Sequence, residues 1–544
     1  MSSAKPSGKR REVPRPLRTF LLLTALFTGL LGLWSVATPL MGFPDEPAHT
    51  IKAAAVVRGQ VVVEEGTSFG HGVHVKVPDY IANLHGQGCY KFNRAQAADC
   101  APPVYSDDTY TNIGVTSAGS YNPMYYWLVG LPTLLMSGAP AIYAMRLISA
   151  VLCALFFAAG FTALTELRRP QYAVLLAAVA TTPMVLFLGG GINPNSLEIA
   201  ATLAAFSGFV VVLDNWRNTS AVAPALVAVA AATVVLANAR QISLVWLLCA
   251  LIAGVCSFRF KRTIQVFKDK RVLTAVALAV PGTLAGLYWI YLAAHGPANV
   301  GVAPDGIANP HPDAPLYRGF MIMLDRTFDF FPQYIGVMGW LDTPAPELVM
   351  LAWGALMIVA LILPFCVRPL RSWTGYWVSL AMLYIVPALL QTVLWRSMGF
   401  IWQGRYTLPL VVVLLVSVGL GMRRLRFSTA PANAAVARTI FYFVAACHTL
   451  TYVYVLRRYV VGISESANWQ TLFSSPHWQP PGGWFLLTAL YLATASIGLE
   501  LLFRYLYPGH SLVMRVRART LANQETDRAR TTAVQPEHAD TAAG

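Results

Sequence analysis

A series of long apolar segments separated by polar stretches constrains the fold of this chain more than any other feature. A bilayer crossing by an α-helix needs about 20 predominantly apolar residues. Only 12% of the residues are charged, about half the fraction of a soluble globular protein. The sequence therefore predicts an all-α polytopic membrane protein with about twelve spans, at residues 19–41, 141–166, 172–190, 196–214, 221–237, 241–258, 272–294, 347–366, 373–394, 406–421, 437–456 and 484–506.

The basic residues set the expected orientation. The net charge of +15 is carried by clusters that fall between the apolar segments, and such clusters favour the cytoplasmic side. We therefore expect a cytoplasmic N-terminus (1–18), an uncleaved first span and a cytoplasmic, disordered tail (508–544). Arg457 and Arg458 disagree with this scheme, because they fall at an outer end. No nucleic-acid partner is expected, since the clusters do not form one continuous patch on a soluble domain.

The apolar segment 121–137 decides the side on which every later loop lies. If it crossed the membrane, the densest basic block, 259–271, would face outside. As an aromatic interfacial helix it leaves that block inside, and we adopt this interpretation. The first outer loop is then large (42–140). It contains Cys89 and Cys100, the two cysteines outside apolar segments, whose spacing suits a disulfide in an oxidising compartment.

The polar stretch Gly42–His49 directly follows the first span. It contains Asp45, Glu46 and His49, and we expect a helix over 48–58 immediately after it. Two interpretations remain open for Asp45. It either caps the first turn of that helix, or it is an ionised carboxylate, stabilised by the helix dipole, that holds a cation or accepts a proton.

Further unusual residues fall at the same outer ends of the spans, in the stretches 189–198, 238–241, 340–342 and 402–406. Arg240 and Arg405 lie there against the inward bias of basic residues. Either they extend to lipid headgroups, or they bind a phosphate in a bidentate manner near the acidic pair. The loop histidines His71, His74 and His85 form only a weak metal motif, and solvated histidines are the simpler explanation.

Four motifs carry a resemblance to a known family: 44–49 (PDEPAH), 122–126 (NPMYY), Pro183-Met184 with Asn193-Pro194, and 403–409 (QGRYTLP). Across residues 20–420 the chain resembles the bacterial membrane family DUF2142, which is similar to the GT-C glycosyltransferases. The resemblance implies a GT-C-like module (19–421) in the plasma membrane, followed by additional C-terminal spans (422–507). Its implied activity is transfer of a sugar from a polyprenyl-phosphate donor to an extracytoplasmic cell-envelope glycan or lipid-linked acceptor.

The same resemblance implies roles for individual residues. Asp45, with Glu46 beside it, would be the catalytic base or a metal ligand, and Arg240 and Arg405 would bind the donor phosphate. Asn195 stands where relatives often have Asp, so a divalent cation (Mg²⁺ or Mn²⁺) would be held by Asp45 together with Glu198. The remaining motif residues are taken as candidates for substrate binding: His49, Tyr125, Asn193, Asn195, Gln403 and Tyr406.

Two other functions compete with this one. A transporter or flippase of a lipid-linked saccharide would need polar residues through the bilayer midplane, whereas the charges here collect at one face. A non-catalytic scaffold would use Asp45 only as a cap. A nucleotide-sugar donor is not expected, because the sequence contains neither a phosphate-binding glycine loop nor a dinucleotide fingerprint.

Overall fold

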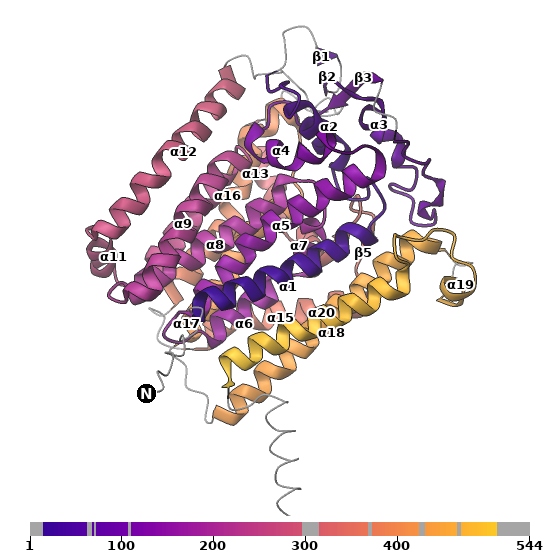
Figure 1. Cartoon of the computed structure of the whole chain (residues 1–544). Helices are drawn as coiled ribbons and strands as arrows, with labels where there is room; N and C mark the ends of the chain where they lie inside the picture. The colour runs from indigo at the N-terminus through magenta and orange to yellow at the C-terminus, as the bar shows by residue number, and fades with distance from the viewer. Residues whose placement is uncertain are drawn as a thin grey trace, which may run out of the picture.

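A computed structural model describes residues 15–62, 68–69, 72–106, 110–295, 315–367, 373–423, 430–464 and 469–508. The N-terminal basic residues before Arg15, His71 and the tail after residue 508 lie outside these ranges, so the expectations for them are not addressed. The described chain is almost entirely helical, with a small sheet at one end of the helical bundle (Figure 1).

Ten helices in the described ranges are long and apolar enough to cross a membrane. They are α1 (Arg15–Ala37), α5 (Gly138–Thr165), α8 (Pro194–Asn215), α9 (Thr219–Ala239), α12 (Lys270–His295), α15 (Glu347–Cys366), α16 (Thr374–Met398), α17 (Leu408–Met422), α18 (Ala430–Val461) and α20 (Trp484–Leu506). The span at α17 includes the short helix η6 that precedes it, and together they cover the 19 residues Gly404–Met422. The pair α6 (Gln171–Ala180) and α7 (Pro183–Gly189) is bent by 67° and makes an eleventh if it is one span. The prediction of an all-α polytopic membrane protein is confirmed.

The expected count of about twelve differs from this number because of α10 (Ser243–Ser257). It coincides with the predicted span 241–258 but has only 15 residues, about 22 Å of helix and less than the hydrocarbon thickness. The other eleven predicted spans each correspond to one of the ten long helices or to the bent pair. The short α10 begins directly after the polar turn at Arg240.

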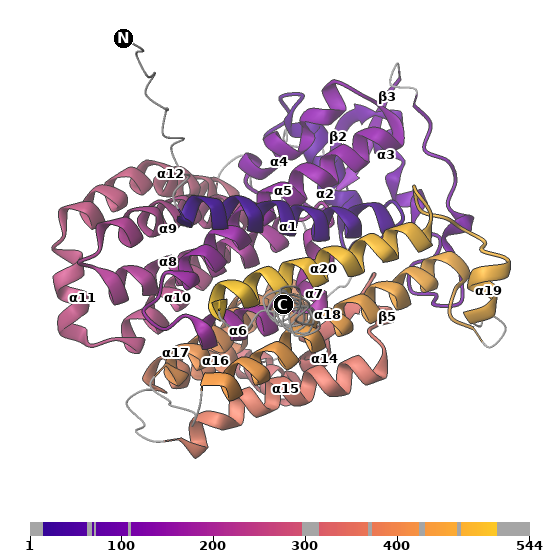
Figure 2. The ribbon, with the colours of Figure 1, turned by 60° about the horizontal axis from the view of Figure 1, so that its bottom comes forward.

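The helices are not equally buried. The apolar window of α8 is 100% buried, while that of α12 is 11% buried. The core helix α8 is rich in Ala, Ser and Gly, and small residues allow neighbouring helices to approach closely. Gly208 shows this requirement, because a Cβ there would lie 2.7 Å from a methyl group of Val229 in α9. In Figures 1 and 2, α12 lies along the edge of the bundle.

The first outer loop folds over one end of the bundle. Strands β1 (Ser68–Phe69), β2 (Gly72–Pro78) and β3 (Thr111–Thr116) form an antiparallel sheet in this order. It packs with α2 (Glu46–Val56) and α3 (Asp79–Ala82). The short helix η1 (Leu84–Gln87) packs against these two helices, and η2 (Ala98–Cys100) packs against α18. Cys89 and Cys100 are joined by a disulfide with a Cα–Cα distance of 6.1 Å. The helix expected over 48–58 begins two residues earlier, with Pro47 in its first turn.

The segment 121–137 does not form a span. It contains only α4 (Pro123–Gly130), eight residues long, and η3 (Leu131–Leu134). Its exposed side chains include Trp127, Leu131 and Leu135, an apolar face suited to the membrane interface. The expected short helix is therefore confirmed, and α5 starts at the same end of the bundle as α2.

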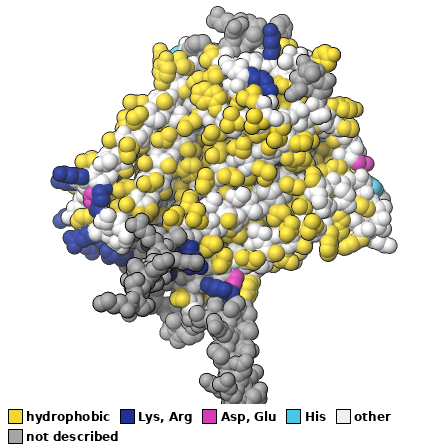
Figure 3. Space-filling model, viewed as in Figure 1, with side chains coloured by type: hydrophobic (Ala, Val, Ile, Leu, Met, Phe, Trp, Pro, Cys, Tyr) yellow, Lys and Arg dark blue, Asp and Glu magenta, His cyan; other side chains and the backbone are white. Residues whose placement is uncertain are grey.

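The basic clusters lie at the other end of the bundle. Figure 3 shows Lys and Arg gathered around α11 (Phe260–Phe267), with hydrophobic side chains spread over the flank of the bundle. The remaining short elements are α13 (Leu316–Asp325), η4 (Arg326–Phe330), α14 (Phe331–Gly336), β4 (Val337–Met338), β5 (Thr343–Pro344), η6 (Gly404–Thr407) and α19 (Trp469–Ser474).

Arg458, the apparent exception to the charge rule, is completely buried at the end where the sheet lies. Its guanidinium donates to the carbonyls of Tyr90 (2.6 Å) and Asn93 (3.0 Å) and lies 3.4 Å from the carboxylate of Asp342. It therefore fastens the outer loop to α18. A buried, ion-paired arginine carries no orientation signal, because the rule concerns charges left in the loops.

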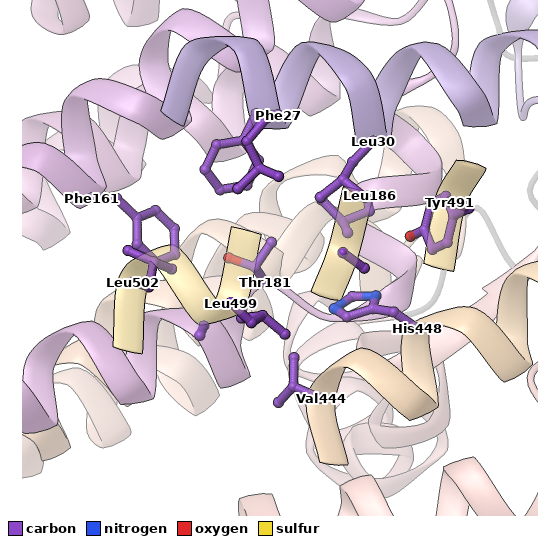
Figure 4. Close-up of a pocket in the computed structure, with 13 residues that line it drawn as sticks. Phe27, Leu30, Phe161, Thr181, Leu186, Val444, His448, Tyr491, Leu499 and Leu502 are labelled. Atoms are coloured by element: carbon purple, nitrogen blue, oxygen red, sulfur yellow. The ribbon is translucent and has the colours of Figure 1, made fainter. Parts of the chain in front are cut away.

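A small apolar cavity lies beside the break between α6 and α7. Figure 4 shows Phe27 and Leu30 of α1 facing Val444 and His448 of α18 across it. The cavity measures about 50 Å³, enough for one or two waters. His448 bonds the backbone of Thr181 at the break, and this satisfies a group that the interrupted helix leaves open.

Cysteine labelling tests the orientation. Lys76 on β2 and Lys268 after α11 are both exposed and lie at opposite ends of the bundle. In a background lacking the five free cysteines, we expect a membrane-impermeant maleimide to label K76C in intact cells and K268C only after permeabilisation. Labelling of both positions from the same side would contradict the arrangement of spans, and labelling of K268C alone in intact cells would reverse the orientation.

Candidate functional site

The link between α1 and α2 is held by side chains from distant parts of the chain. The guanidinium of Arg146 in α5 donates to the carbonyls of Ser35, Thr38 and Pro39 at 2.7–2.8 Å. Further along the link, Tyr90 donates to the carbonyl of Leu40 (2.7 Å). Because these partners come from separate elements, the link has one conformation only when the whole bundle is assembled.

The last residues of the link are fixed in the same way. Trp340 Nε1 donates to the carbonyl of Met41 (3.1 Å), and Asn193 Nδ2 donates to the carbonyl of Pro44 (3.2 Å). The run Gly189–Gly191 allows the α7–α8 connection to come close, since a Cβ on Gly191 would lie 2.5 Å from the ring of Phe43. The link thus forms a rigid platform, as a positioned catalytic group requires.

Asp45 ends this link in a left-handed conformation, with φ of 61°. It occupies the N-cap position of α2, but its side chain makes no capping hydrogen bond. Instead, its Oδ2 lies 2.6 Å from Nη2 of Arg405, and 41% of the side chain is exposed. The capping interpretation is therefore wrong: the backbone conformation turns the carboxylate away from the helix and towards the guanidinium.

Positive φ angles concentrate around this platform. The non-glycine residues with positive φ in the described ranges are Met41, Asp45, Phe92 and Leu341. They belong to three loops in mutual contact, through the bond from Trp340 to Met41 and one from Phe92 N to Asp342 Oδ2 (2.9 Å). Such conformations cost about 1–3 kcal/mol each and persist where the surroundings enforce them, commonly at active sites.

Glu46 has a different environment from its neighbour. It is completely buried, and both carboxylate oxygens are engaged by Arg146, at 2.7 Å to Nε and 2.7 Å to Nη2. With its three carbonyl partners, Arg146 uses every N–H it has. The sequence predicted Glu46 as a catalytic residue, but its position behind the link suits a residue that holds Asp45 in place.

Arg405 lies in η6, at the start of α17. The backbone there is held by Gln333, which accepts from Gly404 N (2.7 Å), and by Trp402, which donates to Thr407 (2.9 Å). The Arg405 side chain is 2% exposed. Its Nη2 is used by Asp45, while Nε and Nη1 have no hydrogen-bond partner among the described residues. Buried, unpaired donors on a charged group are costly and mark a place for an anion.

Arg240 enters the same region from the end of α9. Its Nη1 lies 2.9 Å from Glu198 Oε2, and Glu198 also accepts from Ser243 Oγ (2.5 Å) and Asn195 Nδ2 (3.1 Å). Glu198 is completely buried, so its carboxylate is shielded and serves to orient Arg240. The remaining oxygen of Asn195, Oδ1, is buried without a partner among the described residues.

Tyr406 joins the two arginines. The guanidinium carbons of Arg240 and Arg405 lie 4.9 Å and 5.2 Å from the centre of its ring. Tyr121 also hydrogen-bonds Arg240. The aromatic ring therefore separates two cations that would otherwise repel each other, and both are attracted to its face. The expectation that two guanidiniums meet near Asp45 agrees with this geometry.

The electrostatic field around Asp45 keeps it ionised. Burial would raise the pKa of Asp45, but the charge of Arg405, with smaller effects from His49 and Arg240, outweighs burial and holds the pKa below the ordinary aspartate value. Burial lowers the pKa of His49 to about 4, so its ring is neutral at pH 7. His49 Nδ1 lies 2.8 Å from the hydroxyl of Tyr126.

Some predicted substrate-binding residues lie behind the site. Tyr125 bonds Ser149 (2.8 Å), which supports the carbonyl of Gly191, and Asn193 caps α8 while holding Pro44. Gln403, next to Arg405, keeps its Oε1 buried without a partner in the described part of the chain. The structure therefore brings together Asp45, His49, Arg240, Arg405, Tyr406 and, through Glu198, Asn195.

The sequence analysis missed Arg146 and Tyr121. Arg146 had a signal, since a charged residue inside an apolar segment is rare and normally has a partner. Its partner could not be chosen from the sequence, because several outer carboxylates were available. Tyr121 carried no signal, since aromatics are common at membrane interfaces.

The carboxylates do not fit the expected divalent cation. Asp45 and Glu198 each contact a guanidinium already, which would repel a second cation. In the part of the chain that is described, no group of three or more His, Cys, Asp or Glu side chains could hold a metal ion. The divalent cation thus stays a prediction, and no step proposed below uses one.

Comparison with known proteins adds a family and a fold likeness. Residues 27–414 match the family model described as "Predicted membrane protein (DUF2142)", and no curated protein matches. Apo ArnT from Cupriavidus metallidurans is 12% identical, with a TM-score of 0.43 over 90% of this chain and 78% of that one. ArnT from the same organism bound to undecaprenyl phosphate is 12% identical, with a TM-score of 0.40 over 89% of this chain and 77% of that one.

The arabinosyltransferase EmbB from Mycobacterium smegmatis is also 12% identical, with a TM-score of 0.34 over 91% of this chain and 42% of that one. TM-scores below 0.5 carry no argument about function, which has to come from the geometry around Asp45.

Proposed function

The chain belongs to the DUF2142 family, and on this premise we propose that it is a GT-C-type membrane glycosyltransferase that moves one sugar from a polyprenyl-phosphate donor to a cell-envelope glycan or lipid-linked acceptor. One observation carries the proposal. A half-exposed, ionised Asp45 adjoins a buried Arg405 that has two unpaired donors. This pairing supplies a proton acceptor and an anion-binding group side by side, at the end of the bundle away from the basic loops.

The proposed reaction needs no more than these groups. Asp45 takes the proton from an acceptor hydroxyl while that oxygen bonds to the anomeric carbon of the donor sugar. The bond from the anomeric carbon to the phosphate oxygen breaks, and its electron pair leaves with the polyprenyl phosphate. A free N–H of Arg405 donates to that phosphate as its charge grows. Direct displacement inverts the anomeric centre, and Asp45 then releases its proton to water.

The low pKa of Asp45 in the free protein makes it a weak base, and donor binding corrects this. A phosphate at Arg405 offsets the positive charge that lowers the pKa of Asp45, so the pKa rises in the complex. The second arginine, Arg240, adds long-range attraction for the anion. Its direct pairing with Glu198 leaves it less free to contact the phosphate.

The pH dependence of transfer follows from these pKa values. Asp45 must be deprotonated, and its pKa is lowered in the free enzyme. We therefore expect kcat/KM, which reports the free enzyme, to be flat between about pH 5 and 8 and to fall only in stronger acid. The acid limb of kcat should lie at higher pH than that of kcat/KM, because the bound donor phosphate raises the pKa of Asp45. An acid limb of kcat/KM near pH 6.5 would contradict a base whose pKa is lowered below the ordinary aspartate value.

Substitution of Arg405 tests donor binding. We expect Arg405→Gln to weaken binding of labelled undecaprenyl phosphate by about 10- to 100-fold, since charge-assisted hydrogen bonds contribute about 1.5–3 kcal/mol each. The affinity of Arg405→Lys should lie between those of wild type and Arg405→Gln, because lysine keeps the positive charge but lacks the planar, multiply donating guanidinium. The control is Arg326→Gln, since Arg326 makes an exposed ion pair with Asp329 and lies over the ring of Phe400, with no contact to Asp45. Equal affinity of Arg405→Gln and wild type would refute the phosphate role.

A further inference from the structure

A second concave site lies in the outer loop, away from Asp45. It is a cleft of about 500 Å³ between α3, η1 and the segment that follows the disulfide, and its volume is within the range of ligand-binding sites. We call it the outer cleft. Its lining includes Asp79, Asn83, Gln87, Tyr105 and Tyr110. It lies at the same end of the bundle as the candidate active site, which is the end that would face the extracytoplasmic acceptor.

The polar groups of the outer cleft are preorganised. Asp79 accepts from Asn83 Nδ2 on one carboxylate oxygen and from Asn112 Nδ2 on the other, both at 2.9 Å. Gln87 Nε2 donates to the carbonyl of Pro102 (2.9 Å), which ties one wall to the other. Each Asp79 oxygen keeps a further lone pair for a ligand hydroxyl. Planar amide and carboxylate groups held in this way are suited to pairs of neighbouring hydroxyls.

The aromatic groups of the outer cleft are exposed. Tyr105 is 74% and Tyr110 72% exposed, which is unusual for large side chains that are not lipid-facing. Ring faces pack against the C–H faces of a sugar ring, while the phenol hydroxyls remain available for hydrogen bonds. Three polar side chains beside two open tyrosines make the lining amphipathic, as the surface of a saccharide is.

The disulfide between Cys89 and Cys100 lies beside the outer cleft and restrains it. Cys89 follows η1, which carries Gln87, and Cys100 precedes Pro102 and Tyr105. The bond therefore joins the two walls of the outer cleft directly. A cross-link across a binding site reduces the conformational entropy that ligand binding would otherwise remove.

We propose that the outer cleft binds the acceptor saccharide at sugar units beyond the one that receives the new sugar. This inference rests on the proposed glycosyl transfer and deepens it, because it makes the acceptor an oligosaccharide. A single sugar would occupy only the site at Asp45. A longer chain would reach both sites and bind more tightly, since the second contact is then intramolecular.

Binding to the full-length protein in nanodiscs tests the proposal. The probes are oligosaccharides of one to six units released from the envelope of the strain that encodes this chain, with the lipid-linked forms as a separate arm. We expect affinity to rise with length, and Tyr105→Ala and Asn83→Ala each to weaken binding of long probes about ten-fold. Lys76→Ala, an exposed change on β2 outside the outer cleft, should bind as wild type. Transfer to the monosaccharide should be unchanged in Lys76→Ala.

The outcomes separate this inference from the proposed function. Equal affinity of wild type and the Tyr105→Ala/Asn83→Ala double variant would overturn the inference, as would affinity independent of length. Displacement of the probes by a proline-rich peptide that binds more tightly would also overturn it. Length-dependent, Tyr105-dependent binding without any sugar transfer would keep the saccharide site and refute the transferase. Tighter binding of either the free or the lipid-linked arm supports the inference and identifies the natural form of the acceptor.

Discussion

Asp45→Asn lowers the rate of sugar transfer by about 10²- to 10⁴-fold, the usual contribution of a general base. The change keeps the shape of the side chain and an oxygen that can accept from Arg405 (2.6 Å in the wild type), but it removes the negative charge that takes the proton. The Asp45 side chain is 41% exposed, whereas Arg405 is 2% exposed. Water can reach one side of this pair, so we expect a smaller loss of stability than when a fully buried ion pair is broken. Transfer assays and thermal unfolding in detergent measure the two effects.

The same variant separates the competing functions. A transferase loses product while its lipid-linked donor accumulates on the outer side of the membrane. A flippase would leave its substrate in the inner leaflet, and a scaffold would show neither effect. Asp99→Asn serves as the control, because Asp99 is an exposed acidic residue of η2 in the same outer loop. Full transfer activity in Asp45→Asn would remove the base from the mechanism.

Glu46→Gln has the opposite phenotype. We expect it to destabilise the protein by about 3–5 kcal/mol, because it leaves the buried guanidinium of Arg146 without its counter-charge. The link that carries Asp45 then loses the clamp on its carbonyls, and activity falls with the folded fraction. Fluorescence-detected size-exclusion chromatography after heating measures this loss, with Asp45→Asn as the matched change at the adjacent position.

A double variant checks that the loss arises from an unpaired charge. Glu46→Leu with Arg146→Met removes both ions and should be more stable than either single change, since a buried pair is often replaceable by apolar residues while one isolated ion is not. If Glu46→Gln were as stable as wild type yet inactive, Glu46 would act in the chemistry, as the sequence first predicted.

Much of the fold follows from the chain itself. The apolar segments predict the long helices to within a few residues, because the thickness of the hydrocarbon layer sets their length. The basic block at 259–271 also predicts that the segment before α5 does not cross. The length of α10 could not be predicted, since the turn at Arg240 that precedes it is held by Glu198 in another helix.

The sequence predicted which charged residues belong to the candidate site, but it did not predict which side chains pair with each other. Asp45, Arg240 and Arg405 were recognisable in the sequence, because charged residues at the ends of spans are costly and usually have a function. Nothing local distinguishes Asp45 from Glu46, since the two are adjacent and chemically alike. Their environments diverge only through Arg146 and Arg405, which lie 100 and 360 residues away.

By itself, the sequence determined that this chain crosses a membrane many times and that its chemically distinctive residues lie at one end of the helices. The reason is that the composition of each segment alone decides whether it can enter the apolar bilayer. Only the tertiary structure decided which acid is buried beneath a guanidinium and which remains open to water beside one. The physical reason is that ion pairing and desolvation depend on distances between helices, and residues far apart in the chain set those distances when the bundle packs.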